Sequence, residues 1–359
     1  MKKAIRILFI IINTLLVILL LGSSVAVAVP PSKFIWFSML SYAFLPLAVI
    51  NAFCVLLWLF FKRWEFLIST IALVLRFTMI PLFIQIGGTS SPKESEVRSQ
   101  AEELKVMTYN VHQFSGKNYE KELSTENSKK FLDIVKDELP DVICVQELFE
   151  TNEVSIADSM ELYGYKYRYS NNKDSKGHPY GVAIYSRWEM QYVHTIDKEG
   201  LKIYADIKKD GLTARVVCVH MSSYHLRNED YVDFAELNNK EVGKQKTYNL
   251  LQKVKANVLS HEKEWNEELK AIVNDSPYPI VVAGDFNDTP ASYLSGKMRK
   301  TMKDSFVEKG SGLGITYKGL SPTYRIDYIY HSKNLNTLAY RTLKSDISDH
   351  NGVMAVFTK

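Results

Sequence analysis

Hydrophobic positions follow two different patterns along this chain of 359 residues. The N-terminal part holds three nearly continuous apolar segments, Ile7–Val29, Phe34–Phe61 and Phe66–Ile86. Beyond about residue 104, short apolar runs alternate with longer stretches in which polar residues recur at helical spacing. A helix of about 20 apolar residues can cross the hydrocarbon core of a bilayer, whereas the alternating pattern is typical of a globular domain. The chain is therefore predicted to join a membrane anchor to a globular part.

The three apolar segments can also be interpreted as one signal peptide followed by core helices of a soluble domain. Residues 1–29 resemble a signal peptide, with a cleavage site near residues 26–28. However, core helices keep a polar face, and Ala43–Phe61 has only Asn51 as a strongly polar side chain. The third segment is the weakest, because Arg76 costs about 2.5–3.5 kcal/mol at a helix centre and Pro81 can kink the helix. We expect about three transmembrane helices.

Basic residues predict the orientation of these helices. They cluster at residues 2–6, before the first segment, and at Lys62 and Arg63, between the second and the third. Basic residues favour the cytoplasmic side, so three crossings leave everything after Ile86 outside the cytoplasm. Cleavage of the first segment gives the same result, because two crossings would remain. We predict a multi-pass membrane protein with an extracytoplasmic globular part.

Composition divides the rest of the chain into a linker and one large domain. Residues 87–103 are rich in Gly, Ser, Pro and charged residues, which indicates a flexible linker. The predicted organisation is an anchor over residues 1–86, a linker over 87–103 and a domain over 104–359. That domain mixes helices with strands, as expected of a layered α/β fold with sheets inside and helices outside. The predicted strands are Leu104–Val111, Val142–Val145, Gly181–Tyr185, Ile203–Ile207, Ala214–Val219, Ile280–Ala283, Ile326–Tyr330 and Gly352–Phe357, and the predicted helices are Ser128–Leu139 and Lys244–Val273, the latter with one break.

Charge and cysteine content narrow the function classes. The net charge of +4 divides into +6 for residues 1–92 and −2 for the remainder. A globular part without a basic surplus is not built for tight nonspecific binding to a polyanion, although a local basic patch would still serve a nuclease. The three cysteines show no CxxC or Cys/His spacing, which argues against a zinc site. We interpret them as buried free thiols.

Polar residues lie at the ends of, or within, several predicted strands. Taken singly, each has a structural explanation as a turn residue, a helix N-terminal acid or a hydrogen-bonded histidine. Together the residues fall at six places in the sequence, because two of these places hold two residues each. Six such places are harder to explain as six separate turns, and groups from separate strand ends can converge on one ligand. These residues are Asn110, Glu147, His220, Asp285, Asn287, Asp327, Asp349 and His350.

These residue types suit the attack of water on phosphorus. Carboxylates such as Glu147 and Asp349 are the ligands that a hard cation such as Mg²⁺ prefers. Asp285 and Asn287 can orient and deprotonate a water molecule. His220, His350 and Asn110 can donate hydrogen bonds to phosphoryl oxygens, and Asp327 can fix the second nitrogen of a histidine.

The sequence resembles the endonuclease/exonuclease/phosphatase superfamily, whose members are similar to pancreatic deoxyribonuclease and the abasic-site endonucleases. The resemblance runs from about Lys105 to Phe357. It implies a four-layer fold, a two-sheet sandwich flanked by helices, here preceded by transmembrane helices, and a site at one edge of the sandwich. The motifs, in family order, are TYN at 108–110, QE at 146–147, GVAIYSR at 181–187, the histidine after a strand at His220, GDFN at 284–287, RIDYI at 325–329 and SDH at 348–350.

The resemblance implies a role for each site residue. Glu147 corresponds to the principal ligand of Mg²⁺ or Mn²⁺, Asp349 to a second or water-mediated ligand, and Asn110 to a residue beside both metal and phosphate. Asp285 corresponds to the residue that positions or deprotonates water, with Asn287 as its partner. His350 corresponds to the phosphate-contacting histidine held by Asp327, and His220 to the second histidine.

Three functions remain open at this stage. The leading hypothesis is a membrane-anchored, metal-dependent phosphodiesterase with a nuclease-like mechanism. The second is a phosphomonoesterase or a phospholipase C-type enzyme, similar to sphingomyelinases, acting on lipid head groups. The third is a catalytically silent binding module, which would require the loss of a site residue, yet all are present. The long segment Met221–Glu241, together with His112 and Gln113, leaves open whether the substrate is nucleic acid, phospholipid or a small phosphoester, and no protein partner is evident.

Overall fold

The computed structural model describes residues 3–88, 103–116, 124–224, 240–319 and 324–359. The chain divides into two compact units, which are described separately. Unit 1 comprises Met1–Ile84, Tyr224–Lys263 and Thr289–Lys297. Unit 2 comprises Gln85–Ser223, Glu264–Asp288 and Met298–Lys359. Most of the predicted linker, and most of the long segment after Met221, lie outside the described residues.

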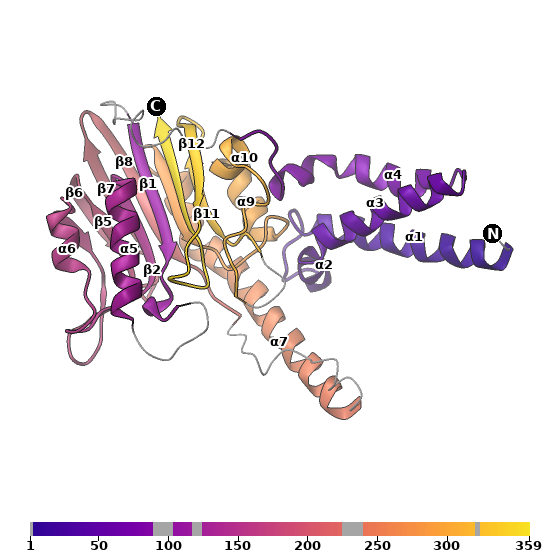
Figure 1. Ribbon diagram of the computed structural model, residues 1–359, viewed down its shortest axis with the longest axis horizontal. Helices are drawn as coiled ribbons and strands as arrows, with labels where there is room; N and C mark the ends of the chain where they lie inside the picture. Colours follow the sequence, from indigo (N-terminus) through magenta and orange to yellow (C-terminus); the bar gives the residue numbers. More distant parts are fainter. Residues whose placement is uncertain (1–2, 89–102, 117–123, 225–239, 320–323) are drawn as a thin grey trace. The chain divides into compact units, whose positions relative to one another are not determined.

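The apolar segments of unit 1 form helices of unequal length. These are α1 (Lys3–Val25), α2 (Ile35–Ser41), α3 (Phe44–Phe60), α4 (Phe66–Leu75) and the 3₁₀ helix η1 (Phe77–Leu82) (Figure 1). Among the described residues, α1 is the one continuous helix long and apolar enough to cross a membrane, and α2 with α3 forms a second candidate bent by 70°. The second predicted segment is thus broken after Ser41. The third leaves α-helical geometry at Arg76, five residues before Pro81.

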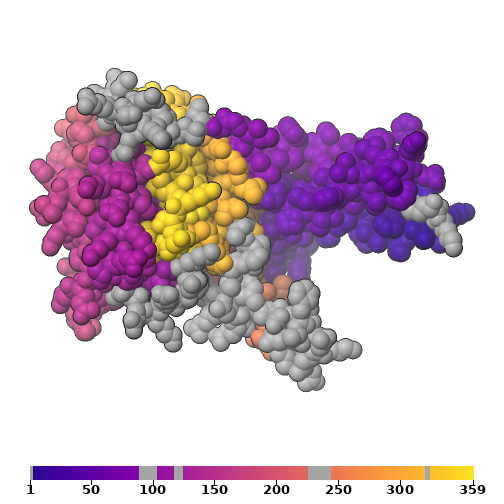
Figure 2. Space-filling view, viewed as in Figure 1, coloured from indigo at the N-terminus to yellow at the C-terminus, as the bar shows by residue number. Residues whose placement is uncertain are grey.

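Inside unit 1, polar side chains are buried between the helices. Asn13 donates to Ser69 Oγ at 3.0 Å, Ser69 donates to Asn51 Oδ1 at 2.8 Å, and Trp58 Nε1 donates to Asn13 Oδ1 at 3.1 Å. Large apolar side chains point outward instead, such as Phe53, which is 66% exposed. Figure 2 shows the surface of these helices in indigo to violet. Buried, hydrogen-bonded polar groups beneath an apolar exterior are typical of helices packed in lipid.

Unit 1 also includes most of a long helix from the later part of the chain, α7 (Lys240–Glu264), and the first residues of α9 (Tyr293–Thr301). At the other end of the apolar helices, Arg6 of α1 forms an ion pair with Glu65, the residue directly before α4. The beginnings of α1 and α4 therefore lie side by side.

Unit 2 contains two mixed β-sheets (Figure 1). The first has the order β12 (Asn336–Leu343), β13 (Gly352–Thr358), β1 (Glu103–Asn110), β2 (Val142–Phe149), β5 (Pro179–Ser186) and β3 (Tyr167–Tyr169), with β4 (Asn172–Lys173) also paired to β5. The second has the order β10 (Met302–Asp304), β11 (Asp327–Ser332), β9 (Ile280–Asp285), β8 (Leu212–His220), β7 (Lys202–Lys209) and β6 (Glu189–Thr195). The pairs β1–β2 and β8–β9 are parallel, and the other strand pairs are antiparallel.

The two sheets pack face to face and helices cover them. Val106 and Val142 of the first sheet share one buried cluster with Val216 and Val281 of the second. On the outer face of the first sheet, the amphipathic helix α5 (Thr125–Glu138) buries Phe131 in another cluster. The remaining helices are η2 (His112–Phe114), α6 (Ala157–Leu162), the π-helix η5 (Trp265–Leu269), α8 (Lys270–Asn274) and α10 (Ser305–Lys309). The predicted α/β sandwich flanked by helices is confirmed.

Candidate active site

The candidate residues gather at one edge of the sandwich because of strand direction. The parallel strands β1 and β2 end at Asn110 and just after Glu147, and the parallel strands β8 and β9 end at His220 and Asp285. Asn110 joins the two sheets, because its Nδ2 donates to Glu147 Oε1 at 2.8 Å and to Asp285 Oδ2 at 3.0 Å. The structure therefore brings these four side chains into one site.

Glu147 reaches this site through a β-bulge. The pairing of β2 with β5 shifts between Val145 and Leu148, and Glu147 has a left-handed backbone with φ of 50°. The neighbouring Gln146 points into the core, where Nε2 lies 3.2 Å from Cys218 Sγ and Oε1 accepts from Thr108. A bulge re-aims a side chain at a strand end, so in this motif Gln146 is structural and Glu147 faces the site.

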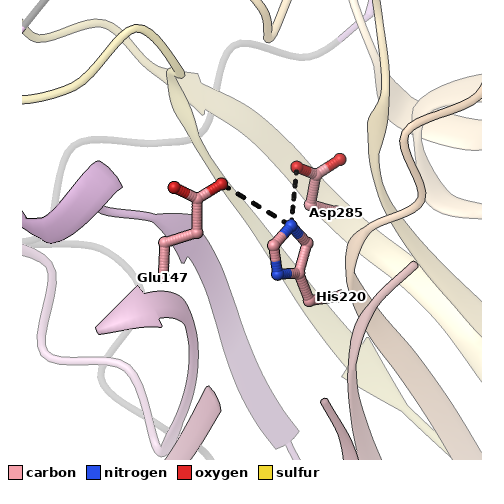
Figure 3. Close-up of side chains that lie close together, drawn as sticks. All are labelled: Glu147, His220 and Asp285. Atoms are coloured by element: carbon pink, nitrogen blue, oxygen red, sulfur yellow. Dashed lines mark ion pairs between the residues drawn. The ribbon is translucent and has the colours of Figure 1, made fainter. Parts of the chain in front are cut away.

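Glu147, His220 and Asp285 form a compact cluster (Figure 3). His220 Nε2 lies 3.5 Å from Glu147 Oε1 and 3.9 Å from Asp285 Oδ2. The three ligand atoms lie within 4.8 Å of one another. His220 Nε2 is buried and makes no hydrogen bond to the part of the chain that the structure describes. A buried nitrogen in that position, facing two carboxylates, fits a site that receives a cation or a substrate.

A second cluster joins Asp285, Asp327 and His350. Asp327 lies opposite Asp285 in the antiparallel pairing of β11 with β9. The His350 Nδ1 lies 2.9 Å from Asp327 Oδ2, and its Nε2 lies 3.8 Å from Asp285 Oδ2. Because the Asp327 carboxylate accepts from Nδ1–H, the Nε2 that faces Asp285 carries a proton when the imidazole is in its cationic form, and can then donate it to an oxygen bound there.

The close charges shift three pKa values. Burial, and then the charge of Asp327, raises the pKa of Asp285 to about 6. Burial opposes protonation of His350, but the charges of Asp327 and Asp285 outweigh it and raise the pKa of that imidazole well above its ordinary value. Burial likewise opposes ionisation of Glu147, yet His220 and the Asn110 hydrogen bond lower its pKa. The site thus favours an anionic Glu147 and a cationic His350.

The GDFN segment is shaped by two local requirements. A Cβ on Gly284 would lie 1.9 Å from the carbonyl oxygen of Val219, so only glycine allows β8 and β9 to approach this closely. Asn287 has φ of 49°, its N–H donates to Asp285 Oδ1 at 2.8 Å, and its Nδ2 donates to the carbonyl of Met221 at 3.0 Å. The turn therefore orients Asp285 through the backbone of Asn287.

Asp349 lies on the side of the site formed by the first sheet. Its Oδ1 lies 3.3 Å from Ser348 Oγ, 3.6 Å from His112 Nδ1 and 4.0 Å from His350 Nε2. His112 belongs to a run of three left-handed residues, with φ of 45° at His112, 52° at Gln113 and 59° at Phe114. Such strain persists where the surroundings hold the backbone, often beside a ligand site.

Two contacts of the site were not anticipated from the sequence. His112 directly follows the TYN motif and its neighbour Val111, but its contact with Asp349 was not predicted. The Tyr317 ring packs edge-on against the His350 imidazole, with centroids 5.2 Å apart. Tyr317 belongs to none of the motifs, and an isolated bridge pairs it with His350.

Comparison with models of known protein families identifies the family of the chain. The model of the Endonuclease/Exonuclease/phosphatase family matches residues 107–350. The chain belongs to this family. Its members are phosphoric ester hydrolases, so the expected superfamily and the expected enzyme class are both confirmed. Residues 6–83 match a separate model, Domain of unknown function (DUF8431).

Solved structures of similar proteins can be aligned with most of this chain. An endonuclease/exonuclease/phosphatase from Bacteroides vulgatus is 17% identical, with a TM-score of 0.48, over 71% of this chain and 98% of its own. A family protein from Leptotrichia buccalis is 16% identical, with a TM-score of 0.48, over 70% of this chain and 98% of its own. The human Nocturnin catalytic domain is 17% identical, with a TM-score of 0.46, over 75% of this chain and 99% of its own. No curated protein matches the chain.

Proposed function

We propose that this family member is a divalent-metal-dependent phosphodiesterase with a nuclease-like mechanism, attached to a membrane by the apolar helices of residues 1–86. One observation carries the catalytic part of the proposal. Asn110 donates to both Glu147 and Asp285 across the two sheets, and His220 and His350 approach the same carboxylates. A site that pairs carboxylates with donors around one point suits hydrolysis of a phosphate ester.

The residues present fit a hard divalent cation such as Mg²⁺ or Mn²⁺. Glu147 is anionic, its side chain remains 28% exposed, and Asn110 and Asp349 supply further oxygen atoms at the same edge. In this proposal Glu147 is the principal ligand, with Asn110 and Asp349 beside it. The bound cation would neutralise charge on the phosphoryl oxygens and lower the pKa of a coordinated water.

The chain's own residues can perform the remaining chemistry. Asp285, oriented by Asn287, accepts a proton from the attacking water as its oxygen bonds to phosphorus. His350, held by Asp327, donates to a phosphoryl oxygen through Nε2, and His220 donates through its own Nε2. The bond from phosphorus to the leaving oxygen then breaks, and that oxygen takes up a proton. The products are a phosphomonoester and an alcohol.

The membrane part of the proposal is supported by unit 1. Its apolar helices α1 to α4 bury polar groups and expose apolar ones, and the Arg6–Glu65 pair brings the beginnings of α1 and α4 together, as three crossings require. We propose an anchor over residues 1–86, a linker over 87–103 and an extracytoplasmic catalytic domain over 104–359. An anchored enzyme meets lipid phosphates, so a phospholipase C-type or phosphomonoesterase activity on head groups is the second candidate.

Hydrolysis of bis-p-nitrophenyl phosphate by the intact chain in detergent tests the mechanism. Turnover should require Mg²⁺ or Mn²⁺, stop with chelator, and be lost in His350→Ala and Asp285→Asn. The matched control is His194→Ala on edge strand β6, which should retain activity. Activity that survives chelation would refute the proposed mechanism. A panel of DNA, RNA, sphingomyelin and inositol phosphates then identifies the substrate.

A further inference from the structure

Helix α7 belongs to the same compact unit as the apolar helices. Near its C-terminal end, Glu262 accepts hydrogen bonds from the backbone N–H of Ser32 at 2.7 Å and from the Ser32 hydroxyl at 2.8 Å. Ser32 lies in the connection between α1 and α2. The ring of Tyr224 also packs between His261 of α7 and Tyr42, with centroid distances of 6.4 and 5.7 Å. This end of α7 is therefore fixed where α1 ends and α2 begins.

The face of α7 that carries Glu262 continues as an exposed stripe. Residues spaced by three or four positions share one face of a helix. Moving back from Glu262, this face carries the buried Val258 and then four exposed side chains, with Tyr248 56% and Leu251 40% exposed. We call this set the α7 stripe; its members are Lys244, Tyr248, Leu251 and Lys255.

The neighbouring exposed face of α7 has a different composition. Gln245, Asn249 and Gln252 are exposed, uncharged and polar, and Gln245 donates to Asn249 at 2.9 Å. Such a face is suited to water. Two cations flanking an aromatic and an aliphatic side chain are instead typical of helices that lie in a lipid interface, where lysine stems extend along apolar surface and their ammonium groups reach the head groups.

We propose that the α7 stripe docks on the surface of an anionic lipid bilayer. The stripe is continuous with the contact at Ser32, so it extends from the point where α1 would leave the membrane. Its two lysines complement negatively charged head groups, and Tyr248 suits the boundary between head groups and acyl chains. This inference rests on the proposed anchoring of α1 in a membrane.

A fluorescent probe can locate the stripe in proteoliposomes that contain the intact chain. We would replace Cys54 by Ser, leave the buried Cys144 and Cys218, and attach an environment-sensitive dye at Leu251→Cys or at the control Asn249→Cys. In vesicles of phosphatidylcholine with phosphatidylglycerol, the dye at position 251 should shift to the blue and be quenched by a lipid-borne nitroxide. The dye at position 249 should do neither.

Charge variants test the electrostatic part. Lys244→Gln with Lys255→Gln should reduce quenching at position 251, because each lysine near an anionic surface contributes about fivefold to binding. Gln245→Glu with Gln252→Glu makes the same change in net charge on the other face and should leave the quenching unchanged. Equal quenching at positions 249 and 251, or quenching between labelled chains without quenching by lipid, would overturn the proposal.

The same vesicles separate this inference from the proposed function. Hydrolysis of bis-p-nitrophenyl phosphate reports the catalytic site, and resistance to alkaline carbonate extraction reports insertion of the helices. A chain that is inserted and quenched at position 251 but hydrolyses nothing would contradict the proposed activity alone. A chain that is inserted and active, with position 251 as exposed to water as position 249, would contradict the docking of the α7 stripe alone.

Discussion

Two Asp–His pairs of unit 2 have the same residue types but different surroundings. Asp327 and His350 are joined by a contact of 2.9 Å and are almost fully buried, whereas Asp174 and His178 are joined at 3.1 Å near the surface. Only the first pair presents its free imidazole nitrogen to another carboxylate, Asp285. Burial and the third group, and not the pair itself, make His350 a candidate for catalysis.

Asp327→Asn should therefore lower kcat for bis-p-nitrophenyl phosphate by about 10- to 100-fold with a smaller change in KM, because His350 loses the anion that orients it. Asp174→Asn is the matched control and should leave kcat unchanged. Steady-state kinetics measure both variants, and circular dichroism checks that they fold. An Asp327→Asn enzyme with unchanged kcat would show that His350 needs no such partner.

His331, away from the site on β11, should make stability depend on pH. Burial lowers the pKa of its imidazole despite the nearby Glu308. As the pH decreases, His331 therefore takes up a proton at a higher pH in the unfolded chain than in the folded chain. Its contribution to stability is fully present above the pKa in the unfolded chain, near 6.5, and is lost as the pH falls toward the pKa in the folded chain. The slope is at most about 1.4 kcal/mol per pH unit. Denaturant unfolding between pH 5 and pH 8, compared with His331→Gln, isolates this contribution; identical slopes would contradict it.

At the scale of elements, the sequence predicted the inner strands and the helix α5 well, because continuous apolar runs and a regular amphipathic pattern are strong local patterns. It did not predict the edge strands β6 and β12. In β6 most side chains, including Tyr192, are exposed, so the strand lacks a buried face. The break in the long predicted helix is a π-helical turn at Trp265–Leu269, which no glycine or proline marks.

The candidate site was predictable in its members but not in its geometry. Motifs named the residues, and parallel pairing explains why they converge. The bulge that separates Gln146 from Glu147, and the left-handed run at His112, depend on partners distant in sequence and could not be read from local patterns. The bend between α2 and α3 likewise interrupts a segment whose composition indicated one continuous helix.

Asp141 connects the two sheets and provides a test of their packing. Its Oδ2 lies 2.8 Å from Lys209 Nζ of the second sheet, and its Oδ1 accepts from Trp188 Nε1 at 2.7 Å. Lys209 is 1% exposed, so its charge needs this partner. Asp141→Asn should lower the free energy of unfolding by about 3–5 kcal/mol.

Denaturant unfolding of the intact chain in detergent measures this cost. Combining Asp141→Asn with Lys209→Met should recover part of the loss, because the double variant leaves no buried unpaired charge. A cost below about 1 kcal/mol for Asp141→Asn would mean that the ion pair does not hold the sheets together.

At the scale of the whole molecule, topology decides where the catalytic site meets its substrate. An alkaline phosphatase reporter fused after Ser99 should be active, because the proposed three crossings from a cytoplasmic N-terminus would place residue 99 outside. The control is a fusion after Arg63, which should be inactive. An inactive reporter after Ser99 would place the catalytic domain in the cytoplasm.

The central claim is that side chains from separate strands of two sheets hold one divalent cation. Electron paramagnetic resonance of Mn²⁺ bound to the intact chain tests it directly. We expect one tightly bound Mn²⁺ per chain, lost in Glu147→Gln and kept in the nearby exposed control Glu153→Gln. Mn²⁺ binding that is unchanged in Glu147→Gln, or equally weak in both variants and in the parent chain, would contradict the account.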